Sequence, residues 1–420
     1  MPFSTPSRPS HLSGALIVAV LLLAISTFIS YVDRGNLSIA APIVKDELGI
    51  SASRLGILLS AFFWTYACLQ PVAGWLVDRW NVNWVLAVGF FLWSGATAAT
   101  AMVHTFGALI VLRFFVGTGE SVAYPSYSKI LVLNFDEERR GLANAAISAG
   151  SVLGPGFGML FGGILVARYG WRPFFLALGL LSLLWLLPWI TFMPKGRQPG
   201  PQTAASPSLS EFLRLRSAWG TSLGLFCSNY LNYFLITWLP FYLVRERHFS
   251  MENMARIAGT AYLLAAFSAV LNGWLSDRWI GSGASPTLVR KTVVGGGLAL
   301  AGAFVGMSGV RGSVAALVLG VLFFGIANSN IWAITQTLAG PQAAGRWTGF
   351  QNFVGNLAGV AAPAVTGFVV DRTGHFYWAF AIVTVVAVAG ATSFILVVGP
   401  VEPVIWRKAV PSEALPIGKN

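Results

Sequence analysis

Hydrophobic residues form long runs along almost the whole chain, and short polar segments separate these runs. A helix needs about 20 mainly apolar residues to cross the hydrocarbon core of a bilayer. The runs of that length cover residues 13–40, 54–77, 83–103, 106–134, 141–167, 172–193, 218–244, 254–276, 292–309, 313–338, 347–370 and 377–399. The pattern therefore predicts an all-α membrane protein with twelve transmembrane helices. The polar segments leave no room for a soluble catalytic domain.

The composition supports a membrane protein and argues against a nucleic-acid partner. Only 10% of the residues are charged, whereas soluble domains carry about 25%. The net charge of +12 follows from Lys and Arg in cytoplasmic loops, where membrane proteins concentrate them. With the N-terminus inside, fifteen of the 27 Lys and Arg residues lie in inner segments and nine in outer loops. We therefore expect both termini in the cytoplasm, a lipid bilayer around the chain and no nucleic-acid partner.

A seven-residue sequence at the end of the second predicted helix returns at the end of the eighth. Residues 74–80, Gly-Trp-Leu-Val-Asp-Arg-Trp, match residues 273–279 at six of seven positions. Such a repeat indicates a duplicated six-helix unit, and transporters built from parallel repeats bind substrate between the halves near the middle of the membrane. The predicted organisation is an N-terminal bundle (1–193), a cytoplasmic linker (194–217) and a C-terminal bundle with a cytoplasmic tail (218–420).

Glycines recur at every fourth position in the fifth and eleventh predicted helices. Residues four apart share one helical face, and small residues there let two helices approach closely. This spacing predicts close helix packing, and the same contact would be free to slide during transport. The first stripe is Gly150, Gly154, Gly158 and Gly162, and the second is Gly355, Gly359, Pro363 and Gly367, with proline in place of one glycine.

Four charged residues lie deep within predicted helices: Asp33, Arg34, Arg113 and Glu120. Each costs about 2.5–3.5 kcal/mol on insertion scales, so such residues usually face the protein interior and serve a function. Arg113 and Glu120 are seven residues apart and therefore lie on one helical face. All four belong to the N-terminal half, which predicts a cavity charged on one side only. The alternative is a pair of structural ion pairs that fix helix packing.

These charges suggest a way to couple an anion to protons. Arginine presents a fixed fork of donors that matches a carboxylate. Burial favours the protonated form of an acid, and a neighbouring arginine favours its ionised form. An anion that occupies the arginine removes this second influence, so the acid can hold a proton. Anion uptake and proton uptake are then linked.

The repeated Gly-x-Leu-x-Asp-Arg sequence resembles the signature loop of the major facilitator superfamily. The resemblance to this superfamily covers essentially the whole chain. The family usually continues with glycine and basic residues, but Asn81, Val82 and Asn83 follow here. The resemblance implies the major facilitator fold, with two pseudo-symmetric six-helix bundles. It also implies gating or structural roles for Asp78, Arg79, Asp277, Arg278, Gly154, Gly158 and Gly359.

Residues 31–38, Tyr-Val-Asp-Arg-Gly-Asn-Leu-Ser, resemble the anion:cation symporter group of that superfamily, as do residues 60–66, 119–125, 170–175, 237–240 and 352–359. This group includes bacterial galactonate, glucarate and hexuronate carriers and the sialin and vesicular glutamate branch. The resemblance implies proton symport of a sugar acid by a protein of the bacterial inner membrane, which we expect to be a monomer.

The resemblance also implies individual roles in the site. Arg34 would bind the substrate carboxylate, and Arg113 would pair with Glu120 and with the anion. Asp33 and Glu120 would carry the protons. The remaining substrate-binding residues would be Tyr31, Tyr66, Ser151, Ser329, Trp332 and Asn352, for which ordinary polar packing is the alternative. No metal or organic cofactor is expected, since protons are the coupling ion.

Two other kinds of function compete with this prediction. A proton-coupled drug or metabolite antiporter of the same superfamily is favoured by residues 113–119 and 150–158, which partly fit exporter motifs. The adjacent Asp33 and Arg34 suit an anionic substrate better. A membrane enzyme or receptor is the more remote alternative, because the chain has no His-Glu-x-x-His or Gly-x-Ser-x-Gly sequence.

Overall fold

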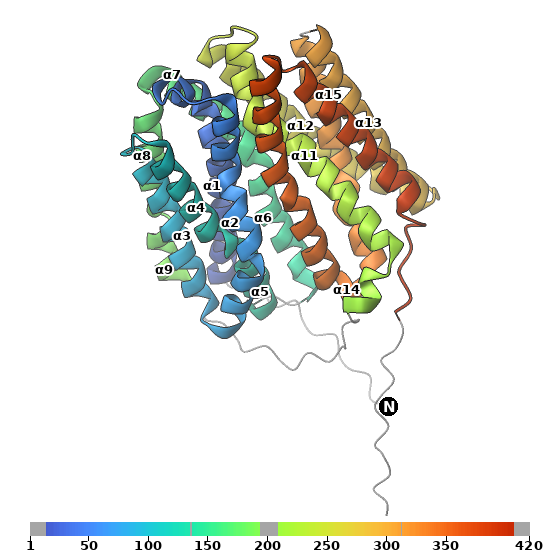
Figure 1. Cartoon of the computed structure of the whole chain (residues 1–420). Coiled ribbons are helices and arrows are strands. Elements are labelled where there is room, and N and C mark those ends of the chain that lie inside the picture. Colours follow the sequence, from blue (N-terminus) through green and yellow to red (C-terminus); the bar gives the residue numbers. More distant parts are fainter. Residues whose placement is uncertain (1–13, 135–136, 194–208, 312, 407–420) are drawn as a thin grey trace, which may run out of the picture.

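A computed structural model of the protein describes residues 14–134, 137–193, 209–311 and 313–406. This part of the chain is helical throughout, and Figure 1 shows the helices packed side by side in one bundle. The helices of the N-terminal half are α1 (Gly14–Glu47), α2 (Ala52–Arg79), α3 (Val82–Thr100), α4 (Phe106–Ser121), α5 (Ala123–Asn134), α6 (Glu137–Phe157), η1 (Gly158–Gly162), α7 (Gly163–Tyr169), α8 (Trp171–Leu183) and α9 (Leu186–Phe192). They are followed by α10 (Leu209–Leu213), α11 (Arg216–Arg245), α12 (Met251–Gly281), α13 (Pro286–Arg311), α14 (Val314–Thr373), α15 (Tyr377–Thr392) and η2 (Ser393–Val397).

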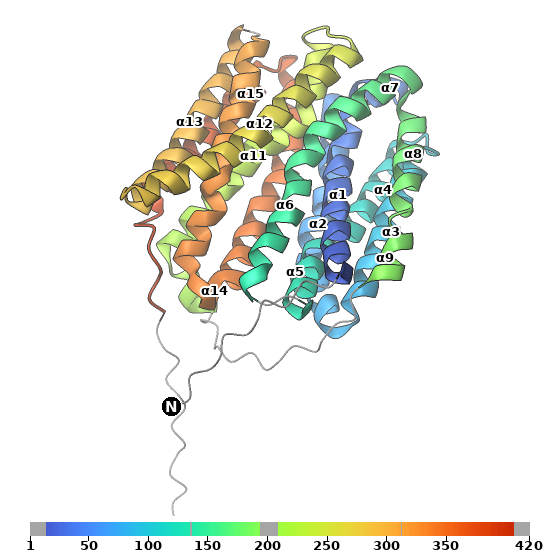
Figure 2. The same cartoon turned by 180° about the vertical axis from the view of Figure 1, so that it is seen from behind.

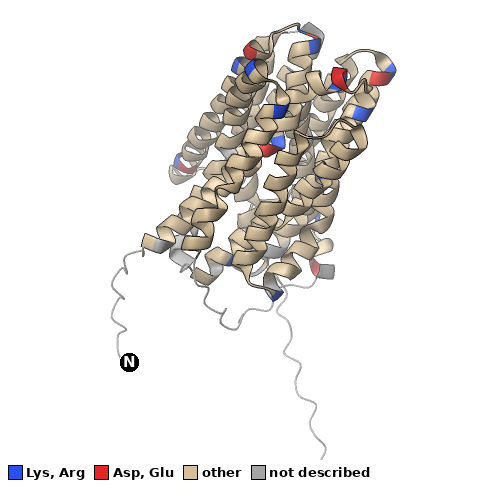
Figure 3. Ribbon diagram, turned by 90° about the vertical axis from the view of Figure 1, so that its left-hand side faces the viewer, with Lys and Arg blue, Asp and Glu red and all other residues tan. Residues whose placement is uncertain are grey.

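The predicted membrane spans coincide with these helices. By length and composition, ten described helices can cross a membrane, and the two parts of α2, bent by 43° between Cys68 and Gln70, make an eleventh candidate. The one predicted span that remains is the seventh in chain order, residues 218–244, which corresponds to α11. This helix is long enough to cross a membrane but carries polar side chains such as Asn229 and Tyr233. Most of α11, including Tyr233, is buried against other helices, and Asn229 lies beside Gly355 of α14. Figure 3 shows that the charged residues gather at the two ends of the bundle.

Local sequence sets several of the helix ends. Ser51, Thr105 and Ser250 have extended backbones, and each side chain accepts a hydrogen bond from an amide in the first turn of the helix that follows. Such caps satisfy amides that have no partner within the helix. A kink at Gly340, where φ is 61°, separates the two spans of α14. A side chain at this position would strain the backbone, which glycine avoids.

The two halves meet along three pairs of helices: α2 with α14, α1 with α11, and α6 with α12. Figures 1 and 2 show these pairs from opposite sides. Glycines permit the closest approach, because a Cβ on Gly56 of α2 would lie 2.4 Å from the carbonyl oxygen of Pro363 of α14. A Cβ on Gly367 of α14 would lie 2.4 Å from the carbonyl oxygen of Ala52. Here α2 and α14 pack backbone against backbone.

The halves are also joined by polar contacts at one end of the bundle, which we call the Asp371 face. Asp371 near the end of α14 accepts hydrogen bonds from the amides of Ala52 (2.9 Å) and Ser53 (3.0 Å) at the start of α2. Arg245 at the end of α11 pairs with Asp46 and donates to the carbonyl oxygen of Pro42 (3.1 Å) in α1. The opposite end, where α2 finishes and the linker begins, is called the linker face.

The glycine stripe of the fifth predicted span packs against α1, as its spacing predicts. A Cβ on Gly150 would lie 2.5 Å from the carbonyl oxygen of Ala24, and one on Gly154 would lie 2.6 Å from the Cβ of Tyr31. One on Gly158 would meet the backbone of Val32 at 3.3 Å. The stripe therefore brings α6 and η1 against the part of α1 that carries the charged residues.

The repeated seven-residue sequence adopts the same geometry in both halves. The guanidinium carbon of Arg79 lies 5.5 Å from the ring centre of Trp75, and that of Arg278 lies 5.5 Å from the ring centre of Trp274. Both arginines and Asp277 are exposed at the linker face, whereas the side chain of Asp78 lies outside the described residues.

The predicted linker is described only in part. Residues 194–208 lie outside the described residues, as do the last residues of the predicted tail from 407 onward. Within the described remainder of the linker, Leu209–Leu213 form the short helix α10, and Arg216 already begins α11.

Candidate substrate and proton site

The four deep charges lie where α1 runs antiparallel to α4. Going up α1, Ser30 and Arg34 contact Glu120, and Asn36 contacts Arg113. Residue numbers rise along α1 while those of their partners on α4 fall, as expected for two antiparallel helices. The side chains of Arg34, Arg113 and Glu120 are no more than 5% exposed. This register brings charges from two helices into a single buried layer.

Arg34 and Glu120 form a buried ion pair. The Nε of Arg34 donates to Oε1 of Glu120 at 2.7 Å, and Ser30 Oγ donates to the same oxygen at 2.6 Å. The Nη2 of Arg34 lies 2.5 Å from this oxygen, but its orientation does not make it a hydrogen bond. We therefore count one directed contact, through Nε. Glu120 therefore approaches Nε and Nη2 with a single oxygen, and does not form the two parallel hydrogen bonds of a bidentate pair.

Aromatic rings enclose the Arg34 guanidinium. Its central carbon lies 4.5 Å from the ring centre of Tyr31, 4.7 Å from that of Tyr66 and 5.5 Å from that of Phe62. Cation–π contacts of this kind stabilise a cation that has lost its water. The predicted residues Tyr31 and Tyr66 thus lie beside Arg34, and the Tyr31 hydroxyl is 3.3 Å from that of Tyr124.

Asp33 and Arg113 belong to a second group, joined by Asn36. The Oδ1 of Asp33 accepts from Asn36 Nδ2 at 2.8 Å and from Thr97 Oγ1 of α3 at 3.3 Å. The Oδ1 of Asn36 accepts from Arg113 Nη1 at 3.3 Å. Asn36 therefore bridges the acid and the arginine with its two ends.

The expected pairing of Arg113 with Glu120 was wrong. Within the described residues Glu120 pairs with Arg34, and Arg113 donates to Asn36 instead. Seven residues span roughly 10 Å along a helix axis, so two side chains on α4 at this spacing are held apart. Side chains of α1 reach each of them separately.

Both acids use only one of their two carboxylate oxygens. Asp33 Oδ2 and Glu120 Oε2 have no hydrogen-bond partner among the described protein groups, and neither do Nε and Nη2 of Arg113. A buried polar atom without a partner costs about 1–3 kcal/mol. The network therefore offers two oxygens that can each hold a proton, and donors that can bind an anion.

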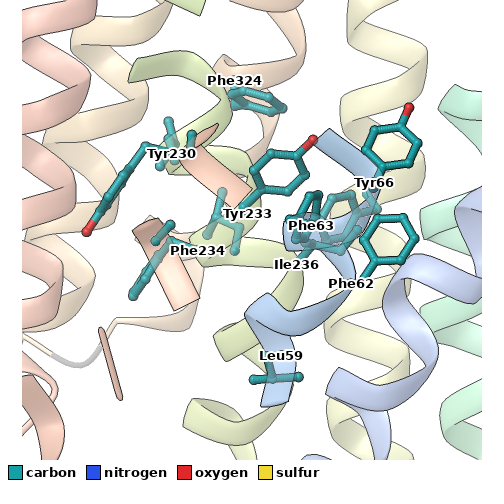
Figure 4. Packing of buried hydrophobic residues seen from close by; sticks show 14 of the residues in the cluster. Leu59, Phe62, Phe63, Tyr66, Tyr230, Tyr233, Phe234, Ile236 and Phe324 are labelled. Atoms are coloured by element: carbon teal, nitrogen blue, oxygen red, sulfur yellow. The ribbon is translucent and has the colours of Figure 1, made fainter. Parts of the chain in front are cut away.

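The C-terminal half supplies an aromatic and amide wall opposite these charges. Phe63 of α2 lies with its ring centre 4.3 Å from that of Tyr233 of α11, and Figure 4 shows them side by side at the junction of the halves. The hydroxyl of Tyr233 donates to Asn356 Oδ1 at 2.8 Å. Asn356 Nδ2 donates to the side-chain oxygen of Asn352 at 3.1 Å. The predicted residue Asn352 is thus connected to the junction through Asn356 and Tyr233.

Three other predicted binding residues have local contacts. Ser329 accepts from Asn272 at 2.8 Å and donates to its own helix, and half-buried Trp332 packs on the hydrophobic core. Ser151 donates to the carbonyl oxygen of Ser148 at 2.7 Å. No contact in the described part of the chain joins these three to the charged network, and their role in binding stays a prediction.

Sequence reasoning missed several members of the site. Ser30 and Asn36 share α1 with the recognised charges, and their polarity within a membrane span was the available signal. Tyr233 lies four residues from both Asn229 and Thr237, so polar residues mark one face of α11. Thr97 gave no comparable signal, because its role depends on how α3 packs against α1.

An apolar cavity of about 350 Å³ lies elsewhere, between α2, α3 and α4. Leu76, Trp84 and Val88 are among the residues that line it. None of the four buried charges borders this cavity. Its chemistry suits hydrocarbon rather than an organic anion.

Long apolar helices that enclose a layer of buried charges are typical of membrane transporters. The model of the Major Facilitator Superfamily matches residues 23–363. The chain belongs to this superfamily, which confirms the resemblance seen in its sequence.

Three relatives match over most of their length. The hexuronate transporter of Bacillus subtilis is 29% identical, with 91% of this chain and 94% of that protein covered. The D-galactonate transporter of Escherichia coli is 28% identical, with 92% and 96% covered. A probable sulfoacetate transporter of Cupriavidus necator is 30% identical, with 84% and 87% covered.

A solved structure has the same fold. It is a bacterial homologue of the human lysosomal transporter Spinster in an inward-facing, unoccupied conformation, with a TM-score of 0.74 and 18% identity over 92% of this chain and 95% of that one. The twelve-helix prediction is consistent with this fold.

Proposed function

We propose that the protein imports a sugar acid together with protons across the bacterial inner membrane, by alternating access of one central site. The observation that carries this proposal is the buried Arg34–Glu120 pair between α1 and α4. The relatives named for hexuronate and galactonate transport support the substrate class. Both termini would lie in the cytoplasm, and a single chain would suffice.

The substrate carboxylate would compete with Glu120 for Arg34. Arginine binds a carboxylate through two parallel hydrogen bonds, and Glu120 uses only Nε in a directed way. When the substrate takes the guanidinium, Glu120 loses its countercharge while it remains buried. A buried carboxylate without a countercharge is costly, so Glu120 takes up a proton. Asp33 would respond in the same way when the anion draws on Arg113.

The two halves would open alternately on either side of this site. With the termini inside, the Asp371 face is the outer face, and the contacts of Asp371 and Arg245 hold it closed. This arrangement suits a state that releases substrate to the cytoplasm.

The test is uptake of radiolabelled galactonate or hexuronate into proteoliposomes with an imposed pH gradient. The wild type is expected to accumulate one of these acids, and Arg34→Ala is expected to lose uptake while the protein still inserts. Arg256→Ala is the matched control, because this arginine forms an exposed i,i+4 pair with Glu252 far from the site. Normal uptake by Arg34→Ala, or no uptake of either acid by the wild type, would contradict the proposal.

A further inference from the structure

Tyr233 of the C-terminal half lies at the junction of the two halves, close to the rings that surround Arg34. It is 6% exposed, and its ring lies against Phe63 from the other half. The ring centre of Phe63 lies 4.9 Å from that of Phe62, and Phe62 in turn flanks the Arg34 guanidinium. Two aromatic side chains therefore separate Tyr233 from Arg34, and a substrate several carbons long that binds Arg34 would extend toward Tyr233.

The hydrogen bonds around Tyr233 fix the direction of its hydroxyl. Asn356 Nδ2 donates hydrogen bonds to two oxygens of Asn352, the backbone carbonyl oxygen at 2.8 Å and the side-chain oxygen at 3.1 Å. This leaves Oδ1 of Asn356 as the acceptor that points at Tyr233. A phenol has a single O–H donor, and Tyr233 commits it to Asn356. What remains on the Tyr233 oxygen is acceptor capacity.

We propose that Tyr233 is a specificity-determining residue that accepts a hydrogen bond from a substrate hydroxyl, with Asn356 as its positioning residue. The inference rests on the proposed function. It adds that the protein donates hydrogen bonds to one end of the substrate and accepts one from the other end. Arg34 takes the carboxylate, and Tyr233 takes a group that donates. A second carboxylate at that point would meet an acceptor, so the site favours a hydroxylated monoacid there.

The test measures binding of D-galactonate, its monodeoxy analogues and its mono-O-methyl ethers to the purified full-length protein by calorimetry. Tyr233→Phe removes one oxygen and is expected to raise the Kd of galactonate roughly tenfold, the usual size of one lost hydrogen bond. For the deoxy analogue that lacks the recognised hydroxyl, Tyr233→Phe is expected to change the Kd by less than twofold. Tyr230→Phe is the matched control, since its hydroxyl points away from Tyr233 in Figure 4, and its Kd values are expected to stay at those of the wild type.

A second variant separates recognition from packing. Asn356→Leu removes the acceptor and frees the Tyr233 proton, so the O-methyl ether at the recognised position is expected to bind this variant better than it binds the wild type. Equal loss for galactonate and all deoxy analogues on Tyr233→Phe, or no loss at all, would overturn the role of Tyr233 alone. A wild type that binds no hexonate would overturn the proposed function and this role together.

Discussion

Glu120 concentrates its contacts on one carboxylate oxygen. Ser30 and Arg34 both approach Oε1, and Oε2 has no partner among the described groups. Asp33 repeats this arrangement, with Asn36 and Thr97 on Oδ1 and no such partner for Oδ2. An amide in place of either acid keeps the accepting oxygen and loses the ability to take a proton. The acidic side chains can therefore be tested without dismantling the network.

Glu120→Gln is expected to permit exchange of substrate across the membrane and to abolish accumulation driven by a pH gradient. The Gln oxygen can still accept from Ser30 and Arg34, but no proton is carried. Counterflow and pH-driven uptake in the same proteoliposomes measure the two activities. Accumulation equal to that of the wild type would remove Glu120 from the coupling mechanism.

The individual charges were predictable from sequence, but their partners were not. A charge within a membrane span is expensive and stands out against apolar neighbours, as Asp33 and Arg113 do. Which partner each charge meets depends on the register between α1 and α4, which periodicity within one helix does not reveal. Tyr233 was missed for the same reason, since its importance comes from the packing of α11 beside α2.

At the scale of the helices, a glycine of α14 allows this helix to pack closely against α2. A Cβ on Gly359 would lie 2.3–2.6 Å from three ring atoms of Phe63, including the atom at the root of the ring. Phe63 in turn packs on Tyr233. Gly359 therefore sets the position of the aromatic contact that separates the two walls of the site.

Gly359→Val is expected to lower the melting temperature and to reduce transport, because Phe63 and α2 must shift to admit the side chain. Overpacking of this kind typically costs about 1–3 kcal/mol. Gly349→Ala on the same helix is the control, since a Cβ there meets nothing within 4 Å. Thermal unfolding in detergent and uptake into vesicles measure both effects. Wild-type stability of Gly359→Val would show that the contact is not tight in the membrane.

Helix positions were predicted closely because long apolar runs and their polar boundaries are local features of the sequence. The break between α4 and α5 at Val122 was not predicted, whereas the kink at Gly340 falls in the gap predicted between the spans 313–338 and 347–370. Pro125 was the available signal for the first break, because proline removes a hydrogen bond within a helix, and Gly340-Pro341 marks the second. Helix caps such as Ser51 and Ser250 are recognisable only after the helix start is known.

At the scale of the molecule, the closed Asp371 face depends on a carboxylate at the start of a helix. Asp371 accepts from two amides of the first turn of α2, where the helix dipole also favours a negative charge. This contact joins the two halves and would have to break before that face opens. It contributes to the balance between the two orientations of the transporter.

Asp371→Asn is expected to shift this balance toward opening of the Asp371 face, because a neutral amide interacts more weakly with the helix start. Spin labels at Met102 and Arg256, exposed positions of the two halves near that face, report the separation by pulsed electron resonance. The population at long distance is expected to rise in Asp371→Asn and to stay unchanged in Asp277→Asn, which lies at the linker face. An unchanged distribution in Asp371→Asn would exclude the contact as a latch.

The central claim is that an anion at Arg34 makes the buried acids take up protons. The most direct measurement is the change in pH when a hexonate is added to concentrated, weakly buffered purified protein near neutral pH. We predict uptake of protons by the wild type in proportion to bound substrate, a smaller uptake in Glu120→Gln, and none in Arg34→Ala. Saturable binding by the wild type without any proton uptake would contradict the coupling.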